Sequence, residues 1–435
     1  MHYLPNIVFV IALIIGIGYF AKNVKKLVRN IKLGHDVDVS DNTSQRWKNM
    51  AMIALGQTKM MHRPISGFLH IVVYVGFVII NIEVLEIIID GIFGTHRIFS
   101  AIGKPYGVLI GAFEILALLV FASVIIFWIR RNVIKLKRFW KSEMTTWPKS
   151  DANIILYFEM VLMTLFLVMN ATDVHFQDMN SGNVISQFIA PWFGSLSEST
   201  LHVIERTAWW LHILGILAFL NYLYFSKHLH ILLAFPNTYY GSLKPQGQFN
   251  NLEAVTKEVR LMMDPNVDPF AVPAEGSETN VPAKFGASDV QDLNWVQLLN
   301  AYTCTECGRC TSECPANQTG KKLSPRKIMM DTRDRLEEVG KNIDLNKGIF
   351  KDDGKQLLDN YITREELWAC TSCNACVEAC PVSINPLSII MDMRRYLVME
   401  QSAAPAELNN MMNNIENNGA PWPYNQMDRL NWKNE

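Results

Sequence analysis

Eight cysteines stand in two copies of one pattern, and their type and spacing indicate metal chemistry. Each copy has three Cys at steps of three, then a fourth Cys followed directly by Pro. The copies comprise Cys304, Cys307, Cys310 and Cys314, then Cys370, Cys373, Cys376 and Cys380. Three cysteines at this spacing wrap a loop around one face of a 4Fe-4S cluster, and the fourth ligates the other cluster in two-cluster ferredoxins.

The sequence therefore predicts two crossed ligand sets. The first consists of Cys304, Cys307, Cys310 and Cys380, and the second of Cys370, Cys373, Cys376 and Cys314. Zinc is the alternative, although zinc sites more often use two Cys-x2-Cys pairs without a third step or a proline. Because these sets use every cysteine, no thiol remains for catalysis. The chain also lacks a G-x-G-x-x-G nucleotide fingerprint, so its catalytic residues stay unassigned.

The segments between and after the two motifs carry helix signals. Ser324 followed by Pro325 fits an N-cap with proline at the first helical position. Residues 328–336 and 387–399 continue in helical periodicity. We therefore expect an α-helical ferredoxin-type domain at 291–400 rather than the small ββ type.

Histidines within apolar segments form the second group that could hold a cofactor. His212 and His230 are 18 residues apart, which is five whole turns and about 27 Å if one helix contains both. His70 and His230 fall at the same predicted depth, so we expect them to be the axial ligands of one b-type haem. His228 would then point to nearly the opposite side of that helix, at the lipid headgroups.

The role of His212 has more than one interpretation. It could ligate a second haem together with His175, His96 or His202, or it could bind a quinone. A histidine inside a membrane can also simply form a hydrogen bond between helices. Four carboxylates in the apolar segments could belong to a proton path or could only face the bundle interior: Glu83, Glu86, Glu114 and Glu159.

Five apolar segments are long enough to span a membrane and to position these histidines. They are residues 5–21, 67–89, 106–129, 154–171 and 207–225. The loops after the first and third segments carry nine and seven Lys or Arg residues, whereas the other two are poor in basic residues. The positive-inside rule then places the N-terminus outside and the cysteine-containing half in the cytoplasm. The first segment lacks the features of a cleaved signal peptide, so we expect a multi-pass protein of the inner membrane.

The composition agrees with this division into a membrane part and a soluble part. The 435 residues are 49% hydrophobic and 19% charged, with a formal net charge of -1. These values argue against a nucleic-acid-binding protein, a disordered chain and a disulfide-rich secreted domain. We expect a transmembrane domain at 1–235, a cytoplasmic segment and linker at 236–290, and a C-terminal tail at 401–435 after the ferredoxin domain.

The membrane part resembles a known cytochrome family. The stretch Trp210-Leu-His212 and the stretch from Phe225 to Pro236 resemble the cytochrome b (gamma) subunit of respiratory nitrate reductase, as does the stretch from Ser66 to His70. This resemblance implies that the matching histidines are haem ligands in a five-helix cytochrome b bundle. The family's second ligand on the helix of His70 has no counterpart here.

The cysteine-rich part resembles iron–sulfur oxidoreductases related to membrane-bound heterodisulfide reductase. The matching stretches run from Ala301 to Cys310, from Gly320 to Arg326 and from Met393 to Met399. Larger relatives continue into CCG domains that carry a catalytic cluster. The resemblance therefore implies a cytoplasmic partner, either a CCG-domain catalytic subunit or a flavoprotein.

Together these features predict a mainly α protein that passes electrons between a membrane quinone or quinol and a cytoplasmic redox partner. The expected cofactors are two 4Fe-4S clusters and one or two b haems, with quinone as a diffusible substrate. Two alternatives remain open. The chain could be a non-catalytic electron conduit of a larger complex, or it could be a haem-free membrane anchor for a ferredoxin module.

Overall fold

The computed structural model describes residues 3–265 and 284–434. It is mainly helical (71%), and the described residues contain no strands. Five helices are long and apolar enough to cross a membrane, and each contains one of the five predicted segments. They are α1 (Leu4–Ile31), α3 (Pro64–Phe93), α4 (Lys104–Asn132), α5 (Thr146–Thr172) and α8 (Glu198–Tyr222), the last extended to Phe225 by a 3-10 turn. The mainly α fold with five candidate membrane helices is thus confirmed.

Local signals explain where several of these helices begin and end. Helices α1, α3 and α4 each have proline in the first turn, where its missing N–H costs no helical hydrogen bond. Helix α3 ends at Gly94, whose φ of 72° is the left-handed conformation that commonly terminates helices. Helix α8 begins after Ser197, whose side chain accepts a hydrogen bond from the Thr200 N–H.

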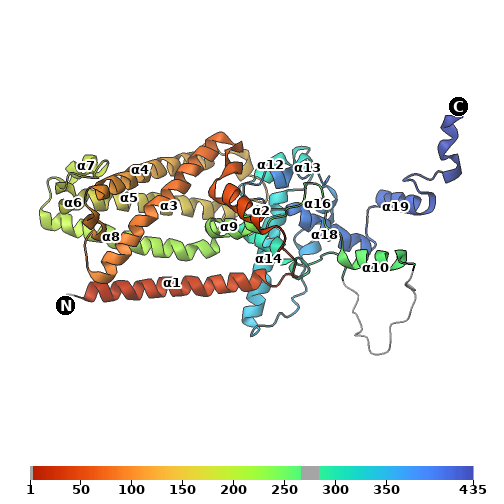
Figure 1. Cartoon of the computed structure of the whole chain (residues 1–435), viewed down its shortest axis with the longest axis horizontal. Coiled ribbons are helices and arrows are strands. Elements are labelled where there is room, and N and C mark those ends of the chain that lie inside the picture. Colours follow the sequence, from red (N-terminus) through yellow and green to blue (C-terminus); the bar gives the residue numbers. More distant parts are fainter. Residues whose placement is uncertain (1–2, 266–283, 435) are drawn as a thin grey trace.

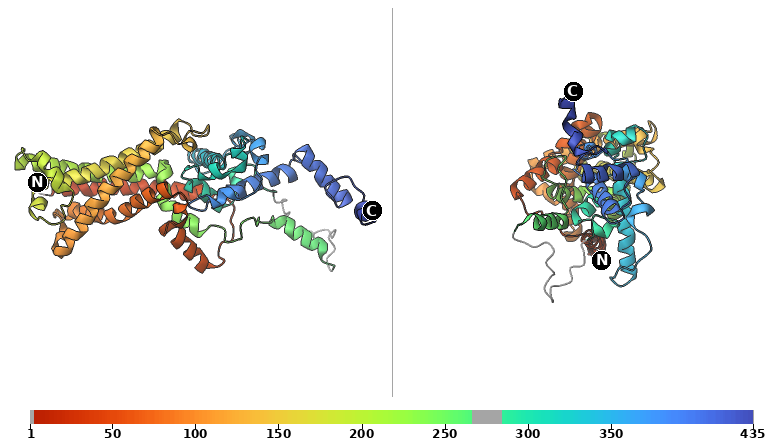
Figure 2. Two further views of the ribbon diagram at one scale, coloured as in Figure 1. Left: turned by 90° about the horizontal axis from the view of Figure 1, so that it is seen from above. Right: turned by 90° about the vertical axis from the view of Figure 1, so that its right-hand side faces the viewer.

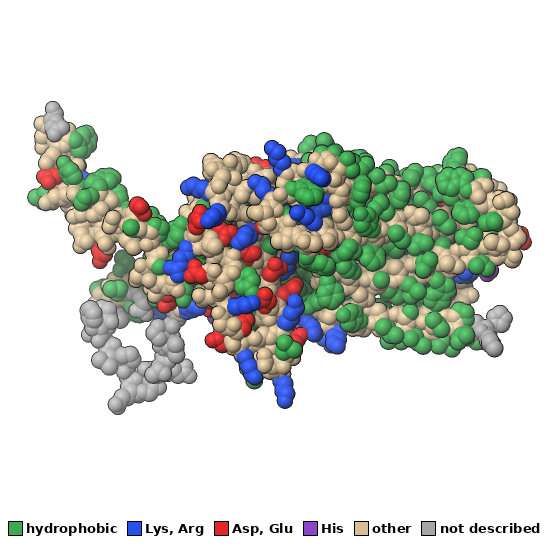
Figure 3. Space-filling view, turned by 180° about the vertical axis from the view of Figure 1, so that it is seen from behind, with side chains coloured by type: hydrophobic (Ala, Val, Ile, Leu, Met, Phe, Trp, Pro, Cys, Tyr) green, Lys and Arg blue, Asp and Glu red, His purple; other side chains and the backbone are tan. Residues whose placement is uncertain are grey.

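The membrane helices lie side by side as a bundle at one end of the molecule (Figure 1). Helix α4 packs against both α3 and α5, and α5 packs against α8. Tyr106, Ile110 and Phe113 of α4 have no exposed surface. On the face drawn in Figure 3, hydrophobic side chains cover the bundle, whereas charged side chains gather over the cysteine-containing half. This separation is what a lipid-facing surface beside an aqueous one requires.

The cysteine-containing half is a smaller helical body that packs against one end of the bundle (Figure 1). Ser324 caps its longest helix, as predicted, and its side chain accepts a hydrogen bond from the Lys327 N–H. Contacts with α1 and α9 join this body to the bundle. Its helices are α11 (Trp295–Thr303), α12 (Arg309–Glu313), α13 (Pro315–Gln318), α14 (Pro325–Leu345), α15 (Leu357–Asn360), α16 (Arg364–Trp368), α17 (Ala375–Glu378) and α18 (Pro386–Met399).

The helix that contains His212 ends at Phe225, as the predicted segment 207–225 does, and it does not continue to His230. Helix α8 and its 3-10 turn end at Phe225, Ser226 is extended, and a second 3-10 turn leads into α9 (His230–Tyr239). The break is stabilised because the Ser226 side chain accepts a hydrogen bond from the His228 N–H, while Asp151 of α5 accepts one from the Lys227 N–H at 3.1 Å.

The break also overturns the expected position of His228. Its Nε2 atom lies 3.5 Å from Oε1 of Glu159 in α5, and its ring centre is 5.2 Å from that of His230. His228 therefore faces the interior close to His230, instead of pointing to the opposite side at the headgroups.

The remaining described segments connect or extend these two parts. Residues 266–283, about a third of the predicted segment and linker at 236–290, lie outside the described residues. The short helices are α2 (Thr43–Met50), α6 (Val174–Asp178), α7 (Ser186–Ile189) and α10 (Glu253–Met263). The tail contains α19 (Ala406–Asn418) and a 3-10 helix (Gln426–Lys433), and both project away from the rest of the molecule in two views (Figures 1 and 2).

Candidate cofactor sites

The two cysteine motifs adopt the same backbone conformation. In the first, Glu306 and Gly308 have positive φ values of 53° and 71°, and in the second Ser372 and Asn374 at the equivalent positions have 57° and 60°. Such left-handed residues curl the chain and turn successive N–H groups toward a common centre, which favours a bound anionic group. The third cysteine of each motif then falls on a short helix, Cys310 on α12 and Cys376 on α17.

The structure brings together the cysteines that were predicted to form the first ligand set. Cys304, Cys307, Cys310 and Cys380 all line one cavity with an empty volume of about 350 Å³. Cys376, assigned to the second set, also lines this cavity. Helices α12 and α17, which carry the third cysteines, pack against each other. The fourth cysteine of one motif is thus placed beside the three cysteines of the other.

The cysteines predicted for the second set are neighbours too. Charge interactions of the Cys376 thiol run to Cys370, Cys314 and Cys373, whereas those of Cys380 run to Cys307. All eight cysteines are free thiols. Cys310 interacts with Cys304, Cys307 and Cys380 but also with Cys376, so the thiols form one group of neighbours in which the crossed sets stay a prediction.

Burial makes these thiols unfavourable as free anions. It raises the pKa of Cys304 and of Cys376 to about 12, and that of Cys380 to about 11. Backbone N–H groups offer some compensation, because Ser372 N lies 3.4 Å from Sγ of Cys370 and Ile384 N lies 3.3 Å from Sγ of Cys380. Iron would replace the protons on these sulfur atoms, since thiolate is the form that ligates metal.

His70 and His230, the predicted haem ligands, face each other. Their ring centres are 6.3 Å apart, with 42° between the ring planes. Two imidazole–metal bonds of about 2 Å on opposite sides of one iron would place the ring centres about 6 Å apart. The geometry therefore fits a metal ion held between the two rings.

The protonation and hydrogen bonding of these histidines fit the same role. Nδ1 of His230 lies 3.2 Å from the Lys227 carbonyl oxygen, which leaves Nε2 as the free ring nitrogen. Burial lowers the pKa of His230 to about 3, so its ring is the neutral imidazole that ligates metals. Nδ1 of His70 is buried and has no hydrogen-bond partner among the described residues.

His212 lies near the middle of α8, in a different environment. It is buried, its ring centre is 6.2 Å from that of Phe166, and its Nδ1 has no partner among the described residues. His202 lies ten residues earlier on the same helix, about 15 Å away along the axis, which is too far to share one metal. His96 and His175 lie beside each other, with ring centres 6.0 Å apart.

An ion-pair network that the sequence did not reveal connects the first cysteine loop to the segment before His230. Glu306, between the first two cysteines, pairs with Lys227 and, at 2.9 Å, with Arg333 of α14. Burial opposes the ionisation of Glu306, but the two cations outweigh it and hold its pKa below the usual value. Lys227 in turn holds His230 through its carbonyl oxygen. In the sequence, this network is signalled only by the charge of Glu306 between Cys304 and Cys307.

Comparison with known proteins supports the iron–sulfur assignment. Residues 303–384 match the family model of a 4Fe-4S dicluster domain. A probable iron-sulfur-binding oxidoreductase, FadF, from Bacillus subtilis (strain 168) is 27% identical over 99% of this chain and 61% of its own length. The EtfAB:quinone oxidoreductase of Syntrophomonas wolfei is 24% identical over 92% of this chain and 55% of its own length.

A third relative matches a shorter region. A probable membrane-anchored ferredoxin from Chromohalobacter salexigens is 33% identical over 34% of this chain and 24% of its own length. The chain thus spans only about half to three fifths of the two longer relatives that it matches along most of its length. No solved structure matches the chain significantly.

Proposed function

We propose that this protein is a membrane-bound electron-transfer subunit of a quinone-linked oxidoreductase. It would pass electrons between a quinone or quinol and a cytoplasmic redox partner through two 4Fe-4S clusters and a b haem. Two relatives are named for parts of this activity, one as a quinone oxidoreductase and one as a membrane-anchored ferredoxin.

The observation that carries this proposal is the proximity of two kinds of metal-ligand group across the junction of the bundle and the cysteine domain. His70 and His230 face each other on the bundle side, and Glu306 links the first cysteine loop to Lys227, three residues before His230. Clusters and haem would supply one-electron redox chemistry. The protein's own part is to fix their separation and exclude water, and the buried ion pairs of Glu306 serve both purposes.

Each cofactor has a defined set of candidate ligands. Cys304, Cys307, Cys310 and Cys380 would hold one cluster, and Cys370, Cys373, Cys376 and Cys314 the other. His70 and His230 would hold the haem, and His212 would act as a ligand only if a second haem is present. The excess of lysine and arginine in two loops supports an orientation in which the junction and the cysteine domain lie on the cytoplasmic side of the inner membrane, with the N-terminus outside.

The partner would be a cytoplasmic protein that carries the substrate site, either a heterodisulfide-reductase-like catalytic subunit or a flavoprotein. Part of this chain resembles a subunit of the dihydromethanophenazine:CoB–CoM heterodisulfide reductase of Methanosarcina mazei, with 26% identity over 33% of the chain. The tail beyond residue 401 extends away from the cysteine domain (Figure 2), where such a partner could contact it.

Optical spectra and metal analysis of the purified chain test this proposal. We expect a b-type absorption band on reduction, one haem per chain and about eight non-haem irons. His230→Ala should abolish the haem and leave the non-haem iron unchanged, because its ring faces His70 rather than a cysteine. His62→Ala is the matched control, since His62 is an exposed histidine beside the same junction, and it should keep both.

The outcomes separate the alternatives. Non-haem iron without haem in the unaltered chain would overturn the haem assignment and favour a membrane anchor for a ferredoxin module. Two haems per chain, with one lost in His212→Ala, would assign His212 as a ligand.

A further inference from the structure

The end of the bundle opposite the cysteine domain contains a cavity that the proposed electron-transfer function does not use. Its volume is about 400 Å³, and residues of α1, α3, α5, α8 and the loop after α3 line it. The acidic lining residues outnumber the basic ones. The charged groups are Glu83, Glu86, Asp90, Asp173 and Glu205 against Arg97 and Arg206, with His96 in addition. We call this the distal cavity.

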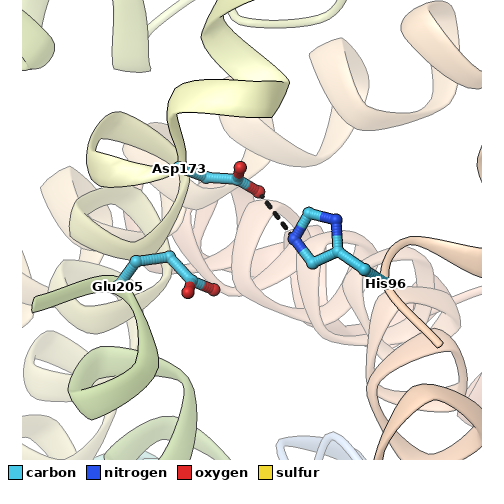
Figure 4. A group of neighbouring side chains, drawn as sticks. All are labelled: His96, Asp173 and Glu205. Atoms are coloured by element: carbon cyan, nitrogen blue, oxygen red, sulfur yellow. Dashed lines mark ion pairs between the residues drawn. The ribbon is translucent and has the colours of Figure 1, made fainter. Parts of the chain in front are cut away.

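Three potential metal ligands from separate elements converge on this cavity. His96 follows α3, Asp173 follows α5, and Glu205 belongs to α8 (Figure 4). Each offers one ligand atom, and these three atoms lie within 4.8 Å of one another. Asp173 and Glu205 are buried, so their positions are set by packing rather than by solvent.

Two of these atoms form an ion pair whose spacing is also close to that between two ligands of one metal (Figure 4). Nε2 of His96 lies 3.2 Å from Oδ2 of Asp173. Tetrahedral zinc with ligand bonds of about 2.0–2.1 Å separates its ligand atoms by about 3.3 Å. The Glu205 carboxylate supplies the third ligand atom of the group, within 4.8 Å of the other two.

Both carboxylates also accept hydrogen bonds from arginine. Nε of Arg97 lies 2.8 Å from Oδ2 of Asp173, and Arg206 pairs with both oxygens of Glu205. Metal-ligating carboxylates are commonly held by such outer hydrogen bonds, which orient them. A carboxylate oxygen has two lone pairs, so Asp173 can keep Arg97 while it ligates a metal.

A second observation independently indicates a missing ligand in the distal cavity. Glu83 lines the cavity and is only 2% exposed, and its Oε2 atom has no hydrogen-bond partner among the described residues. A buried carboxylate oxygen without a partner is costly. A cation or its coordinated water in the cavity would provide that partner.

We propose that the distal cavity binds one divalent transition metal of the zinc class through Nε2 of His96 and the carboxylates of Asp173 and Glu205. The imidazole selects this class over magnesium and calcium, which prefer oxygen ligands alone. The bound metal would tie the loop after α3 to the ends of α5 and α8. The proposal does not depend on the haem or on the clusters.

Zinc titration of the purified full-length chain with its clusters intact tests the proposal. In competition with a chromogenic chelator, we expect one zinc per chain that excess Mg²⁺ or Ca²⁺ does not displace. His96→Ala and Glu205→Gln should each weaken binding at least tenfold, whereas His62→Ala, which removes a distant histidine, should not change it. Unaltered non-haem iron content would show that the variants are folded.

X-ray absorption at the zinc edge of the unaltered chain gives a test that needs no variant. We expect only nitrogen and oxygen ligands at about 2.0 Å. Sulfur at about 2.3 Å would place the zinc on cysteines and overturn the proposal. The absence of stoichiometric binding, or equal affinity in His96→Ala and the unaltered chain, would overturn it as well.

Discussion

Replacing Glu306 by glutamine should destabilise the junction between the cysteine domain and the bundle. The side chain of Glu306 is only 3% exposed, and its two cation partners Lys227 and Arg333 are 10% and 14% exposed. Glutamine keeps the shape but removes the charge, which leaves two cations in a buried site. Breaking a buried pair in this way costs about 3–5 kcal/mol. Because Lys227 keeps Asp151 at 3.8 Å, we expect the lower end, about 3 kcal/mol.

The assay is thermal unfolding in one detergent, followed by tryptophan fluorescence. A loss of about 3 kcal/mol corresponds to a fall in Tm of about 10 °C for a domain of 150–250 residues. Glu365→Gln is the matched control, because Glu365 pairs with Lys322 at the surface and the two side chains are 61% and 68% exposed. An exposed pair contributes about 0–1 kcal/mol. Equal shifts in the two variants would refute the argument that burial makes the Glu306 network strong.

Three further substitutions test other parts of the structure. The double variant Cys314→Ala with Cys373→Ala should keep about four non-haem irons, because both residues belong to one crossed set, whereas an uncrossed arrangement predicts a loss of both clusters. Arg326→Met should destabilise the junction by about 3 kcal/mol and so speed its cleavage by protease, since the buried Glu143 loses its cation partner at 2.7 Å and keeps only the Ser324 hydroxyl; unchanged cleavage would contradict this. Gly308→Ala should lower iron content, because a φ of 71° costs other residues about 1–2 kcal/mol and the added Cβ would lie 2.6 Å from Nη1 of Arg326.

Features that depend on neighbouring residues in the sequence were predictable. The cysteine spacing indicated the dicluster domain because ligand loops are short and local, and Ser324 with Pro325 indicated the start of a helix for the same reason. The five membrane helices followed from the length of their apolar segments. In each case the physical cause lies within one segment of about 20 residues.

Features that depend on distant residues and follow no known ligand pattern were not predicted. The break at Ser226 is stabilised by Asp151, which accepts a hydrogen bond from Lys227 across 76 residues of sequence. Serine alone is tolerated inside a helix, so nothing local distinguished this position. The ion pairs of Glu306 and the convergence of His96 with Asp173 likewise arise only when separate helices pack.

The position of α1 has a consequence for the order in which the parts of the protein assemble. Its C-terminal end contacts the cysteine domain, where Nδ2 of Asn30 donates to the Tyr302 hydroxyl at 2.9 Å and Arg29 donates to the Gly340 carbonyl at 3.0 Å. The two pairs are separated by 272 and 311 residues, so at about 5–20 residues per second α1 is synthesised tens of seconds before its partners. During that interval the polar end of α1 has only water and the other membrane helices as neighbours. Seating of the cysteine domain is therefore among the last steps of assembly, and it depends on a bundle that has already formed.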